Sequence, residues 1–278
     1  MRTPRARALG RALREARENS GRTLRAFAEE IGRDPGLLSR WENGERTPTS
    51  EQVAQVLTKL NITGDRFEEI IALARSVHSP RWLAVTLPEQ HQQFAALLDL
   101  EQTATHIIHV APLLVPGLLQ TNDYIRTIMV KGAPPGEVST RLAARIGRKE
   151  VLTKPRPLHL FALVGEAALR HMVGSAEIMA GQLHHLHDMA AWSNVDVRVI
   201  PFDSGWHPGL EGPFVLLQSR QWSPVVQLES RTSLLLLHEE ADVVPYEAAA
   251  ELVSNVALGP EESAGLISDY AERWELAS

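Results

Sequence analysis

One face of a predicted helix near the N-terminus carries side chains suited to contact DNA. The residues Gly36, Ser39, Arg40 and Asn43 recur at intervals of three and four, so they share one side of a helix. Arg40 could donate two hydrogen bonds to guanine O6 and N7 or reach a phosphate, and the short Ser39 could bond a base edge or the DNA backbone. Asn43, at the far end, is placed for phosphate, and Leu37 flanks the face and could touch a thymine methyl. The chemistry predicted for this face is recognition of double-stranded DNA through the major groove.

The opposite side of the same helix is apolar and needs a partner. Leu38 and Trp41 fall on that side, and residues 24–31 supply apolar side chains at helical spacing to pack against them. The tight turn 32–34 joins the two segments, and Pro35 suits a first helical position because its missing N–H costs nothing there. Two helices joined in this way have the helix-turn-helix layout. A plain helical bundle with a solvated charged face is the alternative interpretation.

The rest of the chain divides into a helical head and a longer mixed region. Residues 1–79 contain five predicted helices separated by turn signals, which indicates an all-α domain. Ser79-Pro80 marks a boundary, and residues 80–100 are predicted to form a helical connector. In residues 101–278, short runs rich in β-branched residues alternate with helical patterns. Because the runs after residue 195 follow one another directly, the sequence predicts an α+β domain with a mainly antiparallel sheet.

The predicted elements of the second region follow from hydrophobic spacing. Strands are predicted at 106–110, 158–164, 195–202, 214–217, 225–228 and 234–238. Helices are predicted at 123–130, 138–152, 166–173, 176–192, 246–256 and 263–274.

Charge and composition narrow the function. The 278 residues carry a net charge of −6, but residues 1–79 have 14 Lys and Arg against 11 Asp and Glu, so the head is basic and the remainder acidic. A basic head indicates an anionic partner. The chain has no cysteine, which excludes disulfide scaffolds, thiol catalysis, Fe–S clusters and thiolate zinc sites. No apolar run reaches the roughly 20 residues of a membrane span, and the basic start lacks a signal-peptide core. We therefore expect a cytoplasmic protein without a membrane partner.

Catalytic and metal-binding patterns are weak. The sequence has no G-x-S-x-G, Walker, G-x-G-x-x-G or H-E-x-x-H motif in a fitting context, so we expect neither an enzyme nor a cofactor. His184, His187 and Asp188 share a helix face at a spacing that metal ligands can have. An apolar stripe runs beside them, however, and histidines on the polar flank of an amphipathic helix are more often solvated. No metal site is predicted.

Residues 9–60 resemble the Xre-type, lambda-repressor-like family of helix-turn-helix transcriptional regulators. The resemblance rests on the segments LGRALREAR, AFAEEIG and LLSRWENGERTP, with Ser39-Arg40-x-Glu42-x-Gly44 before Pro48 as the most specific part. It implies base contacts from Gly36, Ser39 and Arg40, backbone contacts from Arg25, Arg33 and Asn43, and a structural role for Glu42 beside an arginine. This chain has Leu24 where the family often has a phosphate-binding glutamine. The missing contact is either lost or supplied by Arg22 or Arg25.

Residues from about 100 to 275 resemble the C-terminal domain of an actinobacterial group of these regulators. The matching segments include VPGLLQTNDY at 115–124, EAALR at 166–170 and VIPF at 199–202. Members of that group are described as antitoxin-like or developmental regulators, often encoded beside a small partner protein. Most of these residues are expected to be scaffold. The loop with Trp206 and His207 is the best candidate for contact with a ligand or protein partner, because rigid Gly and Pro residues hold an aromatic and a histidine after a strand.

Taken together, the sequence predicts a sequence-specific DNA-binding transcriptional regulator. One recognition helix reads only a few base pairs, so a homodimer on an inverted repeat is expected. Residues 101–278 are expected to act in dimerisation and as the effector domain that receives a signal from a protein partner or a small molecule. The first alternative is an antitoxin-like protein that sequesters a small neighbour-encoded partner and autoregulates its operon. The second is an enzyme with a DNA-targeting head, which a bound cofactor or turnover by residues 80–278 would favour.

Overall fold

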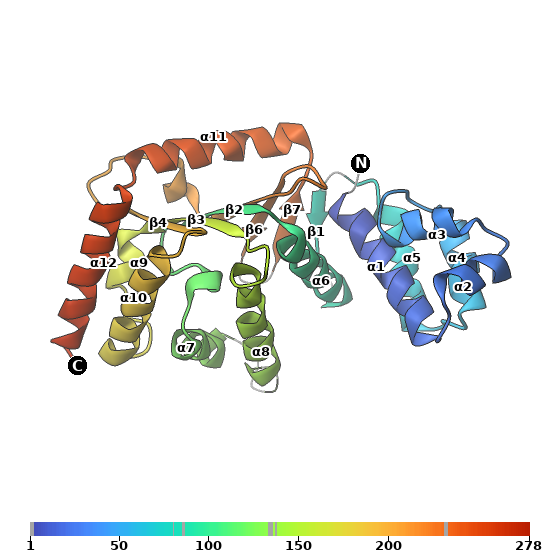
Figure 1. The fold of residues 1–278 in the computed structure, drawn as a ribbon, viewed down its shortest axis with the longest axis horizontal. Helices are drawn as coiled ribbons and strands as arrows, with labels where there is room; N and C mark the ends of the chain where they lie inside the picture. The colour runs from blue at the N-terminus through green and yellow to red at the C-terminus, as the bar shows by residue number, and fades with distance from the viewer. Residues whose placement is uncertain (1–2, 80, 85–86, 133–135, 137, 231–232) are drawn as a thin grey trace. The chain divides into compact units, whose positions relative to one another are not determined.

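The computed structural model describes residues 3–79, 81–84, 87–132, 136, 138–230 and 233–278 (Figure 1). The chain forms two compact units. The first comprises Met1–Thr103 and Ser219–Asp242, and the second comprises Ala104–Gln218 and Val243–Ser278. The predicted functional boundaries at residues 79 and 100 stay a prediction, because compactness alone does not identify where one function ends.

The first unit begins with a group of short helices. They are α1 (Pro4–Asn19), α2 (Leu24–Glu30), α3 (Pro35–Glu42), α4 (Ser50–Lys59) and α5 (Asp65–Ser76). Side chains cap two of their starts: Asp34 accepts a hydrogen bond from the Leu37 amide, and Thr49 and Gln52 form a capping box. These caps satisfy backbone N–H groups that the first helical turn leaves without partners.

After α5 the unit continues with elements from two distant parts of the chain. They are β1 (Arg81–Leu83), α6 (Leu87–Thr103), β6 (Val225–Glu229) and β7 (Leu234–Leu237). Strand β7 pairs antiparallel with both β1 and β6. The predicted helical connector at 80–100 thus starts with a strand, because Trp82 is buried and its strand finds a partner more than 150 residues later in the sequence. Residues 80, 85 and 86 of this connector lie outside the described residues.

Helix α1 packs against α3 and α5 and also against α6. Arg7 on α1 forms an ion pair with Asp99 on α6, with Nη2 2.6 Å from Oδ2, and donates to Thr103 Oγ1 at 3.0 Å. Arg5 donates to the carbonyl oxygen of Arg81 at 2.9 Å and lies over the Trp82 ring. Polar and cation–π contacts therefore attach α1 to the segment that follows the helical head.

The strands of the second unit are β2 (His106–Ala111), β3 (His159–Gly165), β4 (Val195–Ile200) and β5 (Phe214–Gln218). They lie in the order β5-β2-β3-β4. Strand β2 is parallel to β3 and β3 is parallel to β4, whereas β5 is antiparallel to β2. The sheet is mixed, and the prediction of a mainly antiparallel sheet was wrong. Helices lie between β2, β3 and β4 in the sequence, and such crossovers return the chain to start the next strand in the same direction.

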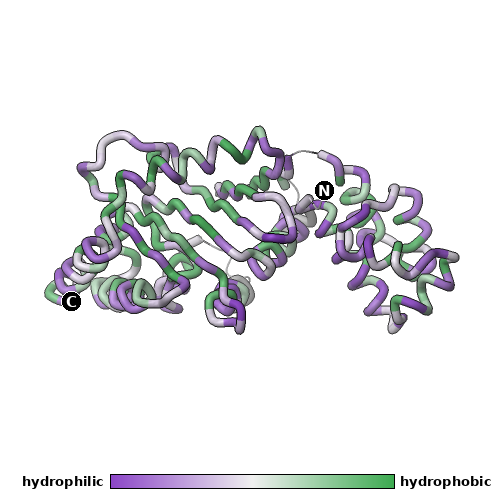
Figure 2. The backbone as a smooth tube through the Cα atoms, turned by 45° about the horizontal axis from the view of Figure 1, so that its top comes forward, coloured by the Kyte–Doolittle hydropathy of each residue, from purple (hydrophilic) through white to green (hydrophobic). Residues whose placement is uncertain are grey.

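Helical segments connect and cover these strands. They are η1 (Gly117–Leu119), α7 (Asn122–Gly132), α8 (Val138–Arg148), η3 (Lys149–Leu152), α9 (Glu166–Arg170), α10 (Ala176–Ala190), η4 (Pro208–Glu211), α11 (Glu240–Val256) and α12 (Pro260–Glu275). Helix α11 lies along one face of the sheet, and α7, α8 and α10 lie on the other (Figure 1). The strands consist mainly of hydrophobic residues, whereas hydrophobic and hydrophilic residues alternate along α11 (Figure 2). This alternation is typical of a helix that is buried on one side only.

His109 on β2 gives the second unit a predicted pH dependence. Burial, together with the nearby charges of Arg148 and Arg145, lowers the pKa of His109 to about 4. The unfolded chain, with a pKa near 6.5, therefore takes up a proton more readily than the folded protein below neutral pH, so stability is full above about pH 6.5 and falls as the pH drops towards 4. Between pH 7 and pH 5 the free energy of unfolding should decrease by about 2 kcal/mol because of this residue. Urea unfolding of the wild type and His109→Gln at both values measures the effect, and an equal pH dependence in the two proteins would contradict it.

In the part of the chain that the structure describes, no helix combines the length and the apolar character needed to cross a membrane.

Candidate nucleic-acid interface

The turn between α2 and α3 is built by local backbone chemistry. Gly32 has a φ of 64°, a left-handed conformation that favours glycine, and the Arg33 amide donates to the Ala28 carbonyl at 2.8 Å. Asp34 then caps α3 by accepting from the Leu37 amide at 2.9 Å, and Pro35 occupies the first turn as predicted. The turn therefore ends one helix and starts the next within a few residues, as the sequence predicted.

Helix α3 separates an apolar face from a polar one. Leu38 and Trp41 are buried, with 1% and 3% of their surfaces exposed. Gly36, Arg40 and Asn43 are exposed, and Leu37 and Ser39 are half-buried. The four residues predicted to share one side of this helix thus lie away from the core with Leu37 beside them, and the predicted division of the helix into two faces is confirmed.

Arg40 is directed towards the N-terminal end of α3. One Nη atom lies 3.5 Å from the position that a Cβ on Gly36 would occupy, one turn earlier. This direction agrees with the general tilt of helical side chains towards the helix N-terminus. The N-terminal residues of a recognition helix are the ones that contact base edges in helix-turn-helix proteins. The guanidinium of Arg40 therefore lies near the N-terminal turn of α3.

The three other predicted arginines differ in their surroundings. Arg25 and Arg33 are exposed, as a contact with DNA phosphates requires. Arg22 is paired with Glu30, with Nε 2.9 Å from Oε2, and its guanidinium lies over the Phe27 ring. Arg22 is therefore held by two contacts within the protein, and Arg25 is the more exposed of these two arginines.

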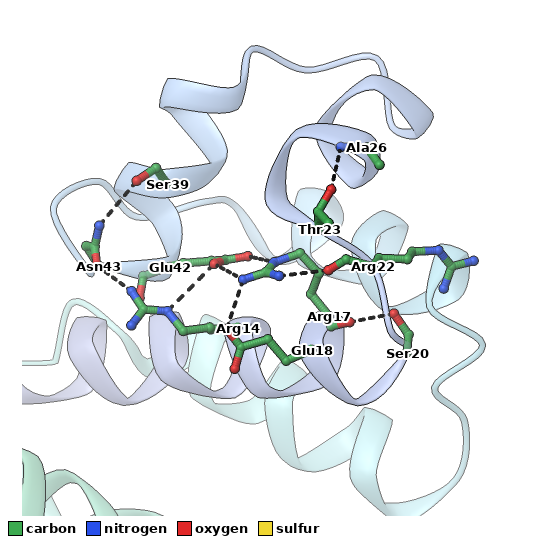
Figure 3. Close-up of polar contacts among 10 residues, drawn as sticks. All are labelled: Arg14, Arg17, Glu18, Ser20, Arg22, Thr23, Ala26, Ser39, Glu42 and Asn43. Atoms are coloured by element: carbon green, nitrogen blue, oxygen red, sulfur yellow. Dashed lines mark hydrogen bonds and ion pairs between the residues drawn. The ribbon is translucent and has the colours of Figure 1, made fainter.

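A buried ion pair holds α3 against α1. Arg17 on α1 donates from Nε and Nη2 to the two carboxylate oxygens of Glu42, at 2.6 and 2.8 Å (Figure 3). Both residues are buried, and the hydrogen bond to Glu42 raises the pKa of Arg17. The expected structural pairing of Glu42 with an arginine is confirmed. Because the arginine fork matches both oxygens, the pair fixes the rotation of α3 as well as its position.

Two glycines allow the close approach of α1 to the end of α3. A Cβ on Gly10 would lie 2.5 Å from the Trp41 carbonyl oxygen, and one on Gly44 would lie 2.9 Å from the Ala6 carbonyl oxygen. Gly44 also has a φ of 65°. The sequence reasoning did not assign a role to Gly10, whose only signal was a glycine inside an otherwise helical pattern.

Arg14 is a further residue at this site that the sequence reasoning missed. It lies on α1, donates to the side-chain oxygen of Asn43, and has an Nε 3.7 Å from the Glu42 carboxylate (Figure 3). Its spacing of three residues from Arg17 was a weak sign that both arginines face α3.

The second group of predicted contact residues lies in the other compact unit. Trp206 and His207 are in the loop between β4 and β5, and the structure separates their environments. Trp206 is 71% exposed, whereas His207 is 5% exposed and burial lowers its pKa. Only Trp206 presents its ring to solvent, so a partner at this loop would meet the tryptophan first.

The histidines on α10 do not gather around a common point. His184 contacts Glu275 on α12 at 2.7 Å, and His187 lies 3.9 Å from Asp188. Within the described residues, no group of three or more His, Cys, Asp or Glu side chains has an arrangement that could hold a metal ion.

Comparison with known proteins identifies both regions. Residues 8–70 match the model of a helix-turn-helix domain. Residues 94–269 match the model described as a domain of unknown function (DUF5753). No curated protein and no solved structure matches the chain. The helix-turn-helix match and the exposed face of α3 support a DNA-binding regulator, and since the second match covers more than half of the chain, the chain belongs to the DUF5753 family.

Proposed function

We propose that this protein is a sequence-specific, DNA-binding transcriptional regulator of the Xre type and that its role is binding, not catalysis. The observation that carries the proposal is the exposed polar face of α3, on which Ser39, Arg40 and Asn43 stand together while Leu38 and Trp41 hold the opposite face in the core. A helix presented in this way after a tight turn can enter a major groove.

The proposal includes a homodimer. A single α3 offers base-edge donors over only a few base pairs, which is too little to define a site in a genome. Two copies on half-sites about one helical turn apart would double the recognised sequence. The operator is therefore expected to be an inverted repeat.

The proposal assigns the regulatory input to the DUF5753 region. Exposed Trp206 supports a contact between that region and a protein partner or small molecule, because a large aromatic side chain at the surface is a common anchor in binding interfaces. An effector that binds there and changes DNA affinity should also raise the thermal stability of the protein.

Arg40→Ala tests the base-reading role. The substitution should weaken binding to the selected operator by about 1–3 kcal/mol and relax the base preference at one position, because a bidentate contact with guanine is lost. The measurement is selection of bound fragments from genomic DNA by the full-length protein and the variant, followed by affinity titration at several salt concentrations. Arg75→Ala, which removes a charge from another exposed arginine, on α5, is the control for net charge.

Two other results would correct the assignment. An even loss of affinity across all sequences, with a salt slope lower by about one, would mean that Arg40 contacts only phosphate. Weak binding by the wild type without any recurrent motif would contradict the proposed function and favour a main role in holding a protein partner.

A further inference from the structure

A chain of hydrogen bonds at the C-terminal end of α3 runs in one direction. Arg14 Nη2 donates to Asn43 Oδ1, and Asn43 Nδ2 donates to Ser39 Oγ at 3.3 Å (Figure 3). A guanidinium has five donors and no acceptor, so the carboxamide atom that faces Arg14 must be the oxygen. Arg14 therefore determines the orientation of the Asn43 amide, which in turn places a donor on Ser39.

This series of hydrogen bonds starts from a carboxylate that is fixed in the core. Glu42 holds the Arg14 Nε at 3.7 Å through its carboxylate, and its carbonyl oxygen accepts from Arg14 Nη2 at 3.4 Å. The same carboxylate is bound by the buried Arg17. The Arg14 side chain is itself 43% exposed. The sequence of contacts thus passes from a buried carboxylate to the exposed face of the helix.

The direction of the chain decides what this face can offer to DNA. The Asn43 oxygen is occupied by Arg14 and one Asn43 N–H by Ser39, so a second N–H is left to donate. Ser39 accepts from Asn43, and its hydroxyl proton has no acceptor among the residues that the structure describes. Each of the two groups therefore has a hydrogen left to donate to DNA.

We propose that Arg14 is a positioning residue that turns the Asn43 amide so that this end of α3 offers hydrogen-bond donors, with Ser39 donating to an acceptor atom on a base edge and Asn43 donating to a phosphate oxygen. The inference rests on the proposed function and specifies its base preference. In the major groove, guanine, adenine N7 and thymine O4 present acceptors, whereas cytosine presents only an amino donor. Cytosine is therefore disfavoured at the base that Ser39 reads. Bidentate pairing of Asn43 with adenine is disfavoured, because it needs a carboxamide oxygen that already faces Arg14 and has one lone pair left.

Selection from a randomised DNA library with full-length wild type and Arg14→Met tests the inference. Methionine keeps an apolar stem but has no donor for Asn43. At one position of the motif, discrimination against cytosine should fall about three- to tenfold, as expected for one hydrogen bond, while the position read by Arg40 keeps its preference. Arg14→Gln retains a donor without the charge and should recover part of the lost discrimination.

Arg11→Met is the matched control, because Arg11 lies on the same helix, has a similarly exposed side chain (46%) and contacts Glu15 and α6 instead of α3. It should leave the base preferences unchanged. If Arg14→Met and Arg11→Met lower affinity equally for all sequences and leave every preference intact, Arg14 acts only through charge and the inference is overturned.

Asn43→Asp tests the direction of the chain without removing Arg14. Aspartate keeps the contact with Arg14 but turns the donor that faces Ser39 into an acceptor, which draws the serine proton inward. The discrimination against cytosine should then disappear, and its persistence would overturn the inference even if Arg14→Met does not fold. A wild type that selects no motif contradicts the proposed function itself, whereas an identical motif for wild type and Arg14→Met contradicts the inference alone.

Discussion

Glu42→Gln is expected to lower the free energy of unfolding of the helical head by about 3 kcal/mol, since it removes the buried counter-charge of Arg17 and leaves only the exposed carboxylate of Glu18, 3.3 Å away. Arg17 donates to both carboxylate oxygens, and glutamine offers only one acceptor in their place. The amide NH₂ of the new side chain would face an arginine donor. The substitution therefore removes the main charge compensation of Arg17 and one hydrogen bond at a largely buried site.

Hydrogen exchange of the α1 and α3 amides in the full-length protein measures this effect locally. Glu29→Gln on α2 removes the same charge from an exposed position. It should change the free energy of exchange of these amides by less than about 0.5 kcal/mol. Equal protection of α1 and α3 in Glu42→Gln and wild type would show that the ion pair does not hold the two helices together.

Gly10→Ala should also destabilise the head, although alanine normally favours a helix. The added Cβ would lie 2.5 Å from the Trp41 carbonyl oxygen and 2.7 Å from that of Glu42, and neither backbone atom can turn away as a side chain could. Alanine gains about 1 kcal/mol in helix propensity, but overpacking costs about 1–3 kcal/mol or more at such sites. We expect a net loss of up to about 2 kcal/mol and weaker DNA binding, because α1 and the end of α3 must separate.

Gly181→Ala is the matched control within the same chain. Gly181 lies inside α10, and an added Cβ there meets nothing within 4 Å. The substitution should therefore stabilise α10 by up to about 1 kcal/mol. Chemical unfolding of both variants measures whether each substitution raises or lowers the free energy of unfolding. A stabilising Gly10→Ala would refute the argument that α1 approaches α3 too closely for a Cβ.

Local chemistry explains which parts of the fold could be predicted from the sequence. The caps at Asp34 and Thr49 involve atoms three residues apart, so the sequence contains the whole interaction. The two faces of α3 follow from helical periodicity in the same way. The direction of the strands does not follow from local sequence, because the parallel pairing of β2, β3 and β4 depends on how the intervening helices return the chain to the sheet. The three-residue β1 was missed because its pairing with β7 is set by residues far away in the sequence.

In the candidate site, too, local features could be predicted from the sequence and contacts between helices could not. Arg40 and Ser39 could be chosen from α3 alone, since exposure follows from their position on the helix. The contacts of Arg14 and Arg17 depend on how closely α1 crosses α3, and that crossing is set by a glycine on one helix and backbone carbonyls on the other. The sequence contains these residues but not their distances.

The arginines of α1 also bear on the ionic atmosphere of the DNA. The first 25 residues contain eight arginines, which in the sequence resembles a strongly basic arm. In the fold, three of them have partners within the protein. Arg5 lies over the Trp82 ring, and Arg7 and Arg17 form ion pairs with Asp99 and Glu42. These three cations are less able to displace sodium or potassium from the duplex, so the affinity for an operator should decline less steeply with added salt than the count of eight arginines implies.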